Sequence, residues 1–140
     1  MQRQGMFTMV LVCFSICAVT GVLGYVRLAP TEAEQWHQPI EATEDTDLAS
    51  GAIRVVGAQN GAFETLETEL KGMERTTLLA GSRSEAHVTY VTRSKWFGFP
   101  DYTTLEQSGE TVKMFGRLRF GRKDFGVNAA RLQKLMSTLK

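Results

Sequence analysis

Cysteine, proline and histidine are scarce in this sequence of 140 residues, which has two, three and two of them. Two cysteines are too few for the disulfide framework of a small secreted domain. Both of them, Cys13 and Cys17, lie inside one apolar run, so the rest of the chain has no thiol for a disulfide, a zinc site or a nucleophile. His37 and His87 are far apart in the sequence, and neither has a carboxylate at ligand spacing. We therefore expect no metal site.

The remaining composition is that of an ordinary folded protein. Hydrophobic residues make up 43% of the chain and charged residues 22%, and the formal net charge is +1. These values exclude a disordered or collagen-like chain. The length leaves room for one domain of about 100 to 150 residues, so we expect a single core that folds without a cofactor.

The longest uniform feature is an uncharged run from Met6 to Val26. Its 21 residues would span roughly 31 Å as a helix, at about 1.5 Å per residue, which matches the hydrocarbon core of a bilayer. A cleaved secretory signal is the alternative, but its apolar region usually has only ~7 to 15 residues and ends at a small-x-small site. The best such site, Val22 to Gly24, lacks alanine. We expect residues 1–27 to form a retained single-pass membrane anchor, with the membrane as partner of residues 6–26.

The charges that flank the run predict its orientation. Arg3 and the amino terminus lie on one side, and Arg27 alone lies near the other. Because basic residues favour the cytoplasmic side, the sequence predicts a cytoplasmic amino terminus and a carboxyl-terminal domain on the far side of the membrane.

Residues 28–50 are rich in Pro, Thr, Glu and Asp and lack a sustained apolar period, which predicts an acidic linker. We expect Trp36 within it either to plug into the folded domain or to lie at the bilayer surface. The globular domain is expected over residues 51–140.

The small net charge conceals two opposed halves. From Leu28 to Glu74 ten acids face two bases, a balance of −8, and from Arg75 onward twelve bases face five acids, a balance of +7. The halves either compensate each other within the fold or leave the basic half free for an anionic partner.

Apolar periodicity predicts an α+β domain after the linker. Phe63, Leu66 and Leu70 recur at helical spacing, and Asn128 is placed to cap a second amphipathic helix. Alternation predicts the strands. The predicted strands cover 52–56, 76–80, 86–92, 102–105 and 111–120. The first predicted helix has its apolar stripe from Phe63 to Met73, and the second, capped by Asn128, has its stripe from Leu132 to Leu139. The simplest assembly is an antiparallel sheet of about five strands, with both helices on one face.

The clearest strand is 111–120. Val112 and Met114 fall on its predicted core face, whereas Phe115, Arg117 and Arg119 fall on the other.

Two sequence blocks carry a family resemblance. They are the GFPD motif from Gly98, followed by Tyr102, and the block RLRFGRKDFGVN from Arg117. With these blocks the chain, from Arg27 to about Leu135, resembles the bacterial domain-of-unknown-function family 1499. Lys123 and Phe125 depart from the small residue and the leucine that are usual there. The resemblance implies a membrane-anchored envelope protein and no chemistry. Together with the predicted orientation, we expect a single-pass protein of the bacterial inner membrane with a periplasmic domain.

One candidate ligand site is a cationic strand surface, because guanidinium groups suit bidentate contact with phosphate or carboxylate. The function this predicts is a non-catalytic binding or structural module for an anionic lipid, glycan or protein. The alternative is that carboxylates of the chain satisfy these arginines. The candidate residues are Arg93, Arg117, Arg119, Arg122, Asp101 and Asp124.

A membrane-tethered, hydrolase-like enzyme using Asp101, Asp124 or His87 is the second hypothesis. These residues have no recognisable catalytic spacing, so we assign no catalytic residue. The near-neutral charge and the predicted anchor argue against nucleic-acid binding.

Overall fold

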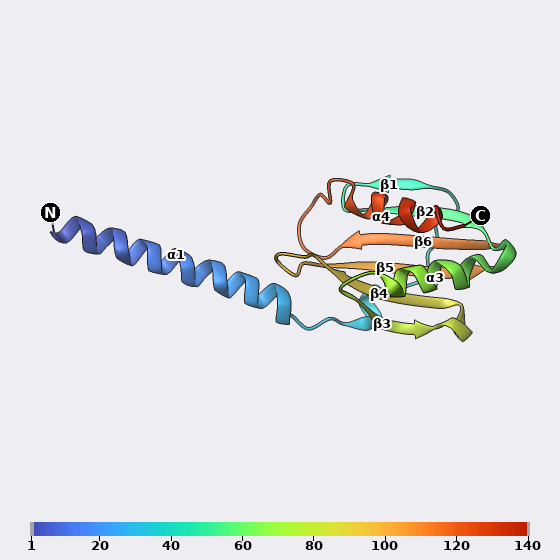
Figure 1. Ribbon diagram of the computed structural model, residues 1–140, viewed down its shortest axis with the longest axis horizontal. Coiled ribbons are helices and arrows are strands. Elements are labelled where there is room, and N and C mark those ends of the chain that lie inside the picture. Colours follow the sequence, from blue (N-terminus) through green and yellow to red (C-terminus); the bar gives the residue numbers. More distant parts are fainter. Residues whose placement is uncertain (1, 140) are drawn as a thin grey trace. The chain divides into compact units, whose positions relative to one another are not determined.

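The computed structural model describes residues 2–139 and divides the chain into two compact units (Figure 1). The first unit ends at Pro30 and the second begins at Thr31. A single helix makes up the first unit, and a sheet with its covering helices makes up the second.

The helix of the first unit is α1 (Gln2–Leu28). Between Gln4 and Leu28 it is apolar and long enough to cross a membrane, and none of its most apolar stretch is buried within the protein. The hydroxyls of Thr8 and Ser15 each donate to the carbonyl four residues earlier, at 2.9 Å. Such bonds satisfy polar side chains locally, as an apolar surrounding requires.

The second unit is built on a six-stranded sheet in which every neighbouring pair is antiparallel. The strand order is β1-β2-β6-β5-β4-β3 (Figure 1). The predicted α+β class is confirmed, with six strands in place of about five. The strands are β1 (Thr46–Leu48), β2 (Gly51–Gly57), β3 (Thr76–Ser82), β4 (His87–Arg93), β5 (Pro100–Ser108) and β6 (Thr111–Leu118).

Two helices, α3 (Ala62–Gly72) and α4 (Val127–Met136), cover one face of the sheet, as predicted (Figure 1). The apolar stripe of each helix and alternate side chains of the strands close one core. Its largest fully buried apolar side chains are Phe63, Leu66, Leu70, Leu105, Met114, Leu132 and Leu135. Three short helices complete the unit: α2 (Ala33–Trp36), η1 (Gln59–Gly61) and η2 (Arg83–Glu85).

The two faces of β6 are the ones that period two predicts. Val112 and Met114 are fully buried beneath the helices, whereas Phe115 and Arg117 lie half-buried on the opposite face. Strand pairing places Tyr102 of β5 directly beside Arg117.

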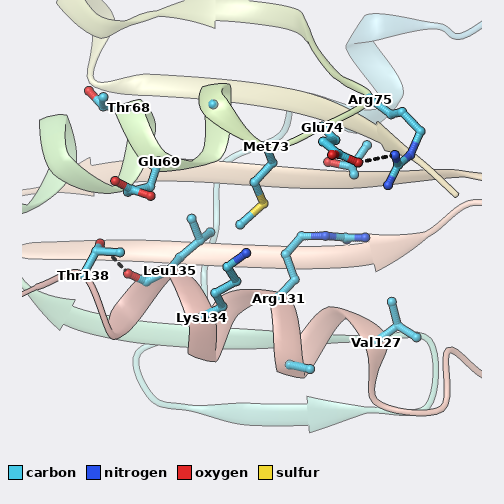
Figure 2. A pocket seen from close by; sticks show the side chains of 13 residues that line it. Thr68, Glu69, Met73, Glu74, Arg75, Val127, Arg131, Lys134, Leu135 and Thr138 are labelled. Atoms are coloured by element: carbon cyan, nitrogen blue, oxygen red, sulfur yellow. Dashed lines mark hydrogen bonds and ion pairs between the residues drawn. The ribbon is translucent and has the colours of Figure 1, made fainter. Parts of the chain in front are cut away.

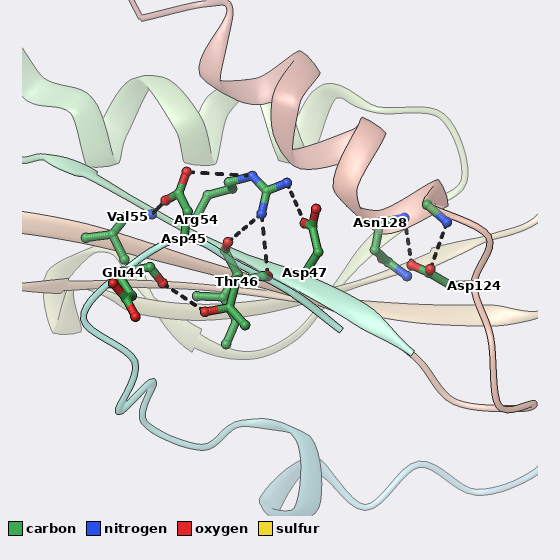
Figure 3. A network of polar contacts seen from close by, with 10 residues as sticks. Glu44, Asp45, Thr46, Asp47, Arg54, Val55, Asp124 and Asn128 are labelled. Atoms are coloured by element: carbon green, nitrogen blue, oxygen red, sulfur yellow. Dashed lines mark hydrogen bonds and ion pairs between the residues drawn. The ribbon is translucent and has the colours of Figure 1, made fainter. Parts of the chain in front are cut away.

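The start of α4 differs from the prediction, because Asp124 and not Asn128 accepts hydrogen bonds from the first amides. Asp124 Oδ1 accepts from the Gly126 amide at 2.9 Å, and Oδ2 accepts from the Asn128 amide at 3.0 Å (Figure 3). Asn128 is fully buried, and its Oδ1 accepts a hydrogen bond from Arg131 at 2.6 Å. Gly116 makes room for it, since a Cβ there would lie 3.0 Å from Asn128 Oδ1.

The edge strand β1 has no counterpart among the predicted strands. Arg54 of β2 holds it, with Nη2 at 2.7 Å from Asp47 Oδ1 and Nε at 3.9 Å from Asp45 Oδ2 (Figure 3). The Val55 amide also donates to Asp45 Oδ1 at 2.9 Å. Residues 28–50, predicted to be a linker, thus include a strand as well as the short helix α2.

Candidate functional site

Residues 31–40, which we call the strap, lie along the sheet face opposite α3 and α4. At the centre of the strap, the Trp36 ring stacks on Tyr102 of β5 with centroids 4.0 Å apart. At its end, the buried Ile40 donates its amide to Glu106 Oε2 at 2.7 Å. These contacts bind the strap to the sheet. Of the two positions expected for Trp36, the structure shows the first, in which the ring packs against the folded domain.

Arg117 lies between the strap and the sheet. Its guanidinium carbon is 4.6 Å from the centroid of Phe115 and 5.3 Å from the centroid of Trp36, and Nη2 donates to the Trp36 carbonyl. Desolvation by burial lowers the pKa of Arg117. Within residues 2–139 no carboxylate forms an ion pair with Arg117. Aromatic faces and a carbonyl therefore stabilise this cation.

Arg119 contacts the beginning of the strap. Its Nη1 donates to Thr31 Oγ1 at 2.9 Å and to the Tyr102 hydroxyl at 3.2 Å, and these two oxygens are 3.1 Å apart. The strand arginines therefore contact the chain's own strap, and the predicted open cationic strand face differs from the structure in this respect.

His37 of the strap contacts His87 of β4 on the sheet face beneath the strap. The rings of His37 and His87 stack with centroids 3.8 Å apart, and His37 Nδ1 lies 2.9 Å from Thr89 Oγ1. Burial lowers the pKa of His37 most, and the charge of His87 adds to this, while Glu85 and Glu106 oppose it. The neutral form of His37 is therefore favoured in the folded protein.

The two candidate aspartates have structural contacts on other parts of the fold. Asp101 Oδ2 lies 3.1 Å from Arg131 Nη2, and the pKa of Asp101 is raised because desolvation outweighs that partner. Burial would also raise the pKa of Asp124, but its bonds from Gly126 and Asn128 outweigh burial and lower it. Both carboxylates thus help to fix α4.

The structure does not bring the predicted catalytic candidates together. His87 lies at the start of β4, opposite Glu106 of β5, and faces the strap. Asp101 pairs with Thr92 at the other end of β4 and contacts α4 on the opposite face of the sheet. Asp124 lies in the connection from β6 to α4. It lies near Asp101, since its charge adds to the raised pKa of Asp101, but His87 shares a site with neither aspartate.

Arg93 and Arg122 differ in their surroundings. Arg93 Nη1 donates to the Gly98 carbonyl at 2.9 Å, which closes the connection from β4 to β5. Arg122 is exposed in the connection from β6 to α4. Of the four candidate arginines, Arg122 is exposed and the other three are half-buried.

These two connections form an exposed aromatic and basic area, which we call the loop surface and define as residues 94–99 and 120–126. Trp96 is 77% exposed and Phe125 is 91% exposed. Phe99 and Phe120 join the two connections, with ring centroids 6.5 Å apart. The bases of the loop surface are Lys95, Arg122 and Lys123, and all three are exposed.

The exposure of these aromatic rings is not predicted from the sequence. A signal was present, because five of the chain's 13 aromatic residues fall within the 13 residues of the loop surface, together with three bases and one acid. Composition alone does not reveal whether aromatic side chains point inward or outward, so this signal gains its meaning only from the fold.

An open groove of about 710 Å³ lies between α3 and α4 (Figure 2). Glu69 and Met73 line it from the α3 side, and Arg131 and Lys134 line it from α4 (Figure 2). Arg131 is already bonded to Asp101 and Asn128. The remaining lining mixes both charges and favours no particular class of ligand.

A protein-family model described as "Protein of unknown function (DUF1499)" matches residues 26–139, which include every strand of the sheet and both covering helices. The chain belongs to the DUF1499 family. No curated protein and no solved structure matches it. Within this DUF1499 domain, the two sequence blocks that carry the resemblance form much of the loop surface and the beginnings of β5 and α4.

Proposed function

We propose that this DUF1499 chain is a single-pass membrane protein whose second unit is a non-catalytic binding module, and that its loop surface binds an anionic partner. The observation that carries the proposal is the composition of that surface: three exposed bases beside exposed aromatic rings. Its one acid, Asp124, is buried and has both oxygens bonded to backbone amides. The net field there is positive, which favours anions.

The proposal places binding at the loop surface because the other candidate arginines have structural contacts. Arg117 and Arg119 contact the strap, and Arg93 contacts Gly98. The exposed cations of the loop surface are Lys95, Arg122 and Lys123. A guanidinium fork suits the phosphate or carboxylate of a lipid, a glycan or a protein, and the aromatic rings supply apolar area around it.

The proposed location is the bacterial cytoplasmic membrane, with α1 as anchor and the second unit in the periplasm. Support comes from the length and apolarity of α1 and from Arg3 with the amino terminus, two positive charges that outweigh the single Arg27 at the other end.

Charge reversal at the loop surface tests the binding proposal. The full-length chain in mild detergent is applied to immobilised heparin, a polyanion, and eluted with salt. We expect the double variant Arg122→Glu, Lys123→Glu to elute at clearly lower salt than the unchanged chain, because two attractive contacts become repulsive.

The matched control is Lys71→Glu, Lys134→Glu, which makes the same change in net charge on α3 and α4. It should elute close to the unchanged chain. Equal shifts in the two double variants would contradict a localised anion-binding surface, because net charge alone would then explain retention.

A further inference from the structure

We infer that the loop surface docks on the headgroup region of the same bilayer that holds α1, so that the partner is an anionic lipid surface. This inference rests on the proposed membrane anchoring and narrows the proposed anionic partner to one class. Three features support it: the place where the chain enters the second unit, the chemistry of the loop surface, and the backbone of Phe125.

The chain enters the second unit beside the loop surface. Thr31, its first residue, is bonded to Arg119, whose amide donates to the Pro100 carbonyl at 3.3 Å. Arg119 directly precedes one segment of the loop surface, and Pro100 directly follows the other. The chain entry and the loop surface therefore share one end of the sheet.

The chain between α1 and Thr31 is short. Only Ala29 and Pro30 separate Leu28, the last residue of α1, from Thr31. Three steps of about 3.8 Å between successive Cα atoms allow at most about 11 Å. For an anchored α1, the covalent chain thus keeps the loop-surface end of the second unit near the headgroups.

The side chains of the loop surface suit that region of a bilayer. Tryptophan and other amphipathic aromatic rings are enriched at membrane interfaces, where an apolar ring borders a polar medium. Lys95, Arg122 and Lys123 add the attraction of exposed bases to anionic lipids. A soluble acidic protein would satisfy the bases, but it would not account for exposed rings beside the chain entry.

Phe125 contributes a backbone observation. Its φ of 54° lies in the left-handed region, which is unfavourable for a bulky residue, and its side chain is 91% exposed. Burial of the Phe125 ring within the domain therefore does not offset the cost of this backbone conformation. Insertion of the ring among lipid headgroups would supply that burial.

Tryptophan fluorescence tests the docking, because the chain has only Trp36 and Trp96. The full-length protein is reconstituted in nanodiscs of phosphatidylglycerol and phosphatidylcholine whose acyl chains are brominated near the headgroups. We expect strong quenching, and we expect Trp96→Phe to remove most of it, since the remaining Trp36 is half-buried against Tyr102. Equal quenching of the unchanged chain and Trp96→Phe would overturn the inference.

A longer tether separates true docking from mere proximity. Inserting about 20 Gly/Ser residues between Pro30 and Thr31 gives a mean reach of roughly 25 Å and frees the second unit from the surface. Docking predicts that quenching persists, and that Arg122→Glu, Lys123→Glu then abolishes it in these anionic discs. Loss of quenching on lengthening alone would overturn docking. If the heparin result holds while quenching fails, an anionic partner other than the bilayer is indicated, and the binding proposal survives without this inference.

Discussion

Buried carboxylates in this domain are matched individually to donors. Glu67 is 6% exposed, and its two oxygens accept from the Tyr90 hydroxyl at 2.8 Å and from Arg83 Nε at 2.6 Å. Burial and the nearby carboxylate raise the pKa of Tyr90 to about 12. The phenol therefore remains a neutral donor at physiological pH. Glu67 therefore has a structural role: it links α3 to Tyr90 of β4, and each of its oxygens has a defined donor.

The two hydrogen bonds that Asp124 accepts predict a loss of stability when this side chain is removed. Asp124→Ala removes two acceptors from backbone amides at the start of α4, so we expect a loss of about 1 to 2 kcal/mol in the free energy of unfolding. Denaturant unfolding of the full-length chain in mild detergent measures it. Asp47→Ala is the control, because Asp47 is in an exposed pair with Arg54, for which ~0 to 1 kcal/mol is typical. A loss no larger than that of the control would contradict the role assigned to Asp124.

The sequence correctly predicts which face of a strand each residue lies on, but it does not predict which other parts of the chain contact that face. Alternation assigns Arg117 to the face away from the core, and the structure agrees. It does not reveal that Trp36, 81 residues away in the sequence, lies over Arg117. Likewise, the position of Asn128 resembles a cap, but the helix begins earlier, and Asp124 accepts from the amides of Gly126 and Asn128. The first difference comes from a tertiary contact that local sequence does not encode, whereas the second is a local choice between two residues that can both cap a helix.

Among the elements, the strap is the one whose stability should depend most on pH near neutrality. Burial and His87 lower the pKa of His37 in the folded state, so the unfolded chain binds the proton more readily. We expect the free energy of unfolding to be unaffected above about pH 6.5 and to fall as the pH drops below that value. The charged groups facing His37 are His87, Glu85 and Glu106, and the two glutamates moderate the effect.

Thermal unfolding between about pH 5.5 and 7.5, a range above the titration of ordinary carboxylates, measures this dependence. His37→Gln should flatten the decline in melting temperature on acidification. The control is Gln38→Ala, which changes a neighbouring exposed residue of the strap and leaves both histidines. An equally steep decline in His37→Gln would show that another group is responsible.

Helices and strands that the apolar core stabilises can be predicted from the sequence, and those held by a few polar or aromatic contacts cannot. Sequence alone locates α3, α4, β2 and β6, because each has a repeating apolar pattern that one face of the core requires. It misses β1, and of the strap it anticipates only the packing of Trp36. Arg54 and its two aspartates hold β1, and one stacked tryptophan and a few hydrogen bonds hold the strap. Such contacts leave no periodic signal.

For the whole molecule, membrane anchoring is the first prediction to test. We expect the full-length chain to stay in the membrane pellet after alkaline carbonate extraction, because α1 is apolar over Gln4–Leu28. Val12→Arg combined with Val19→Arg should release most of the protein, since each central arginine costs about 2.5 to 3.5 kcal/mol on insertion. Recovery of the intact, unchanged chain from the soluble fraction would contradict the anchor.

The strap also determines how the molecule would respond to mechanical load. Because the polypeptide enters the second unit at Thr31 and runs across β5 and β6 to Ile40, tension from the amino-terminal side reaches the hydrogen bonds of Thr31 first and the Trp36 stack next. Such tension would peel these contacts one after another before it strained the sheet. Each step would uncover more of the surface around Arg117, so pulling would be converted into exposure of positive charge.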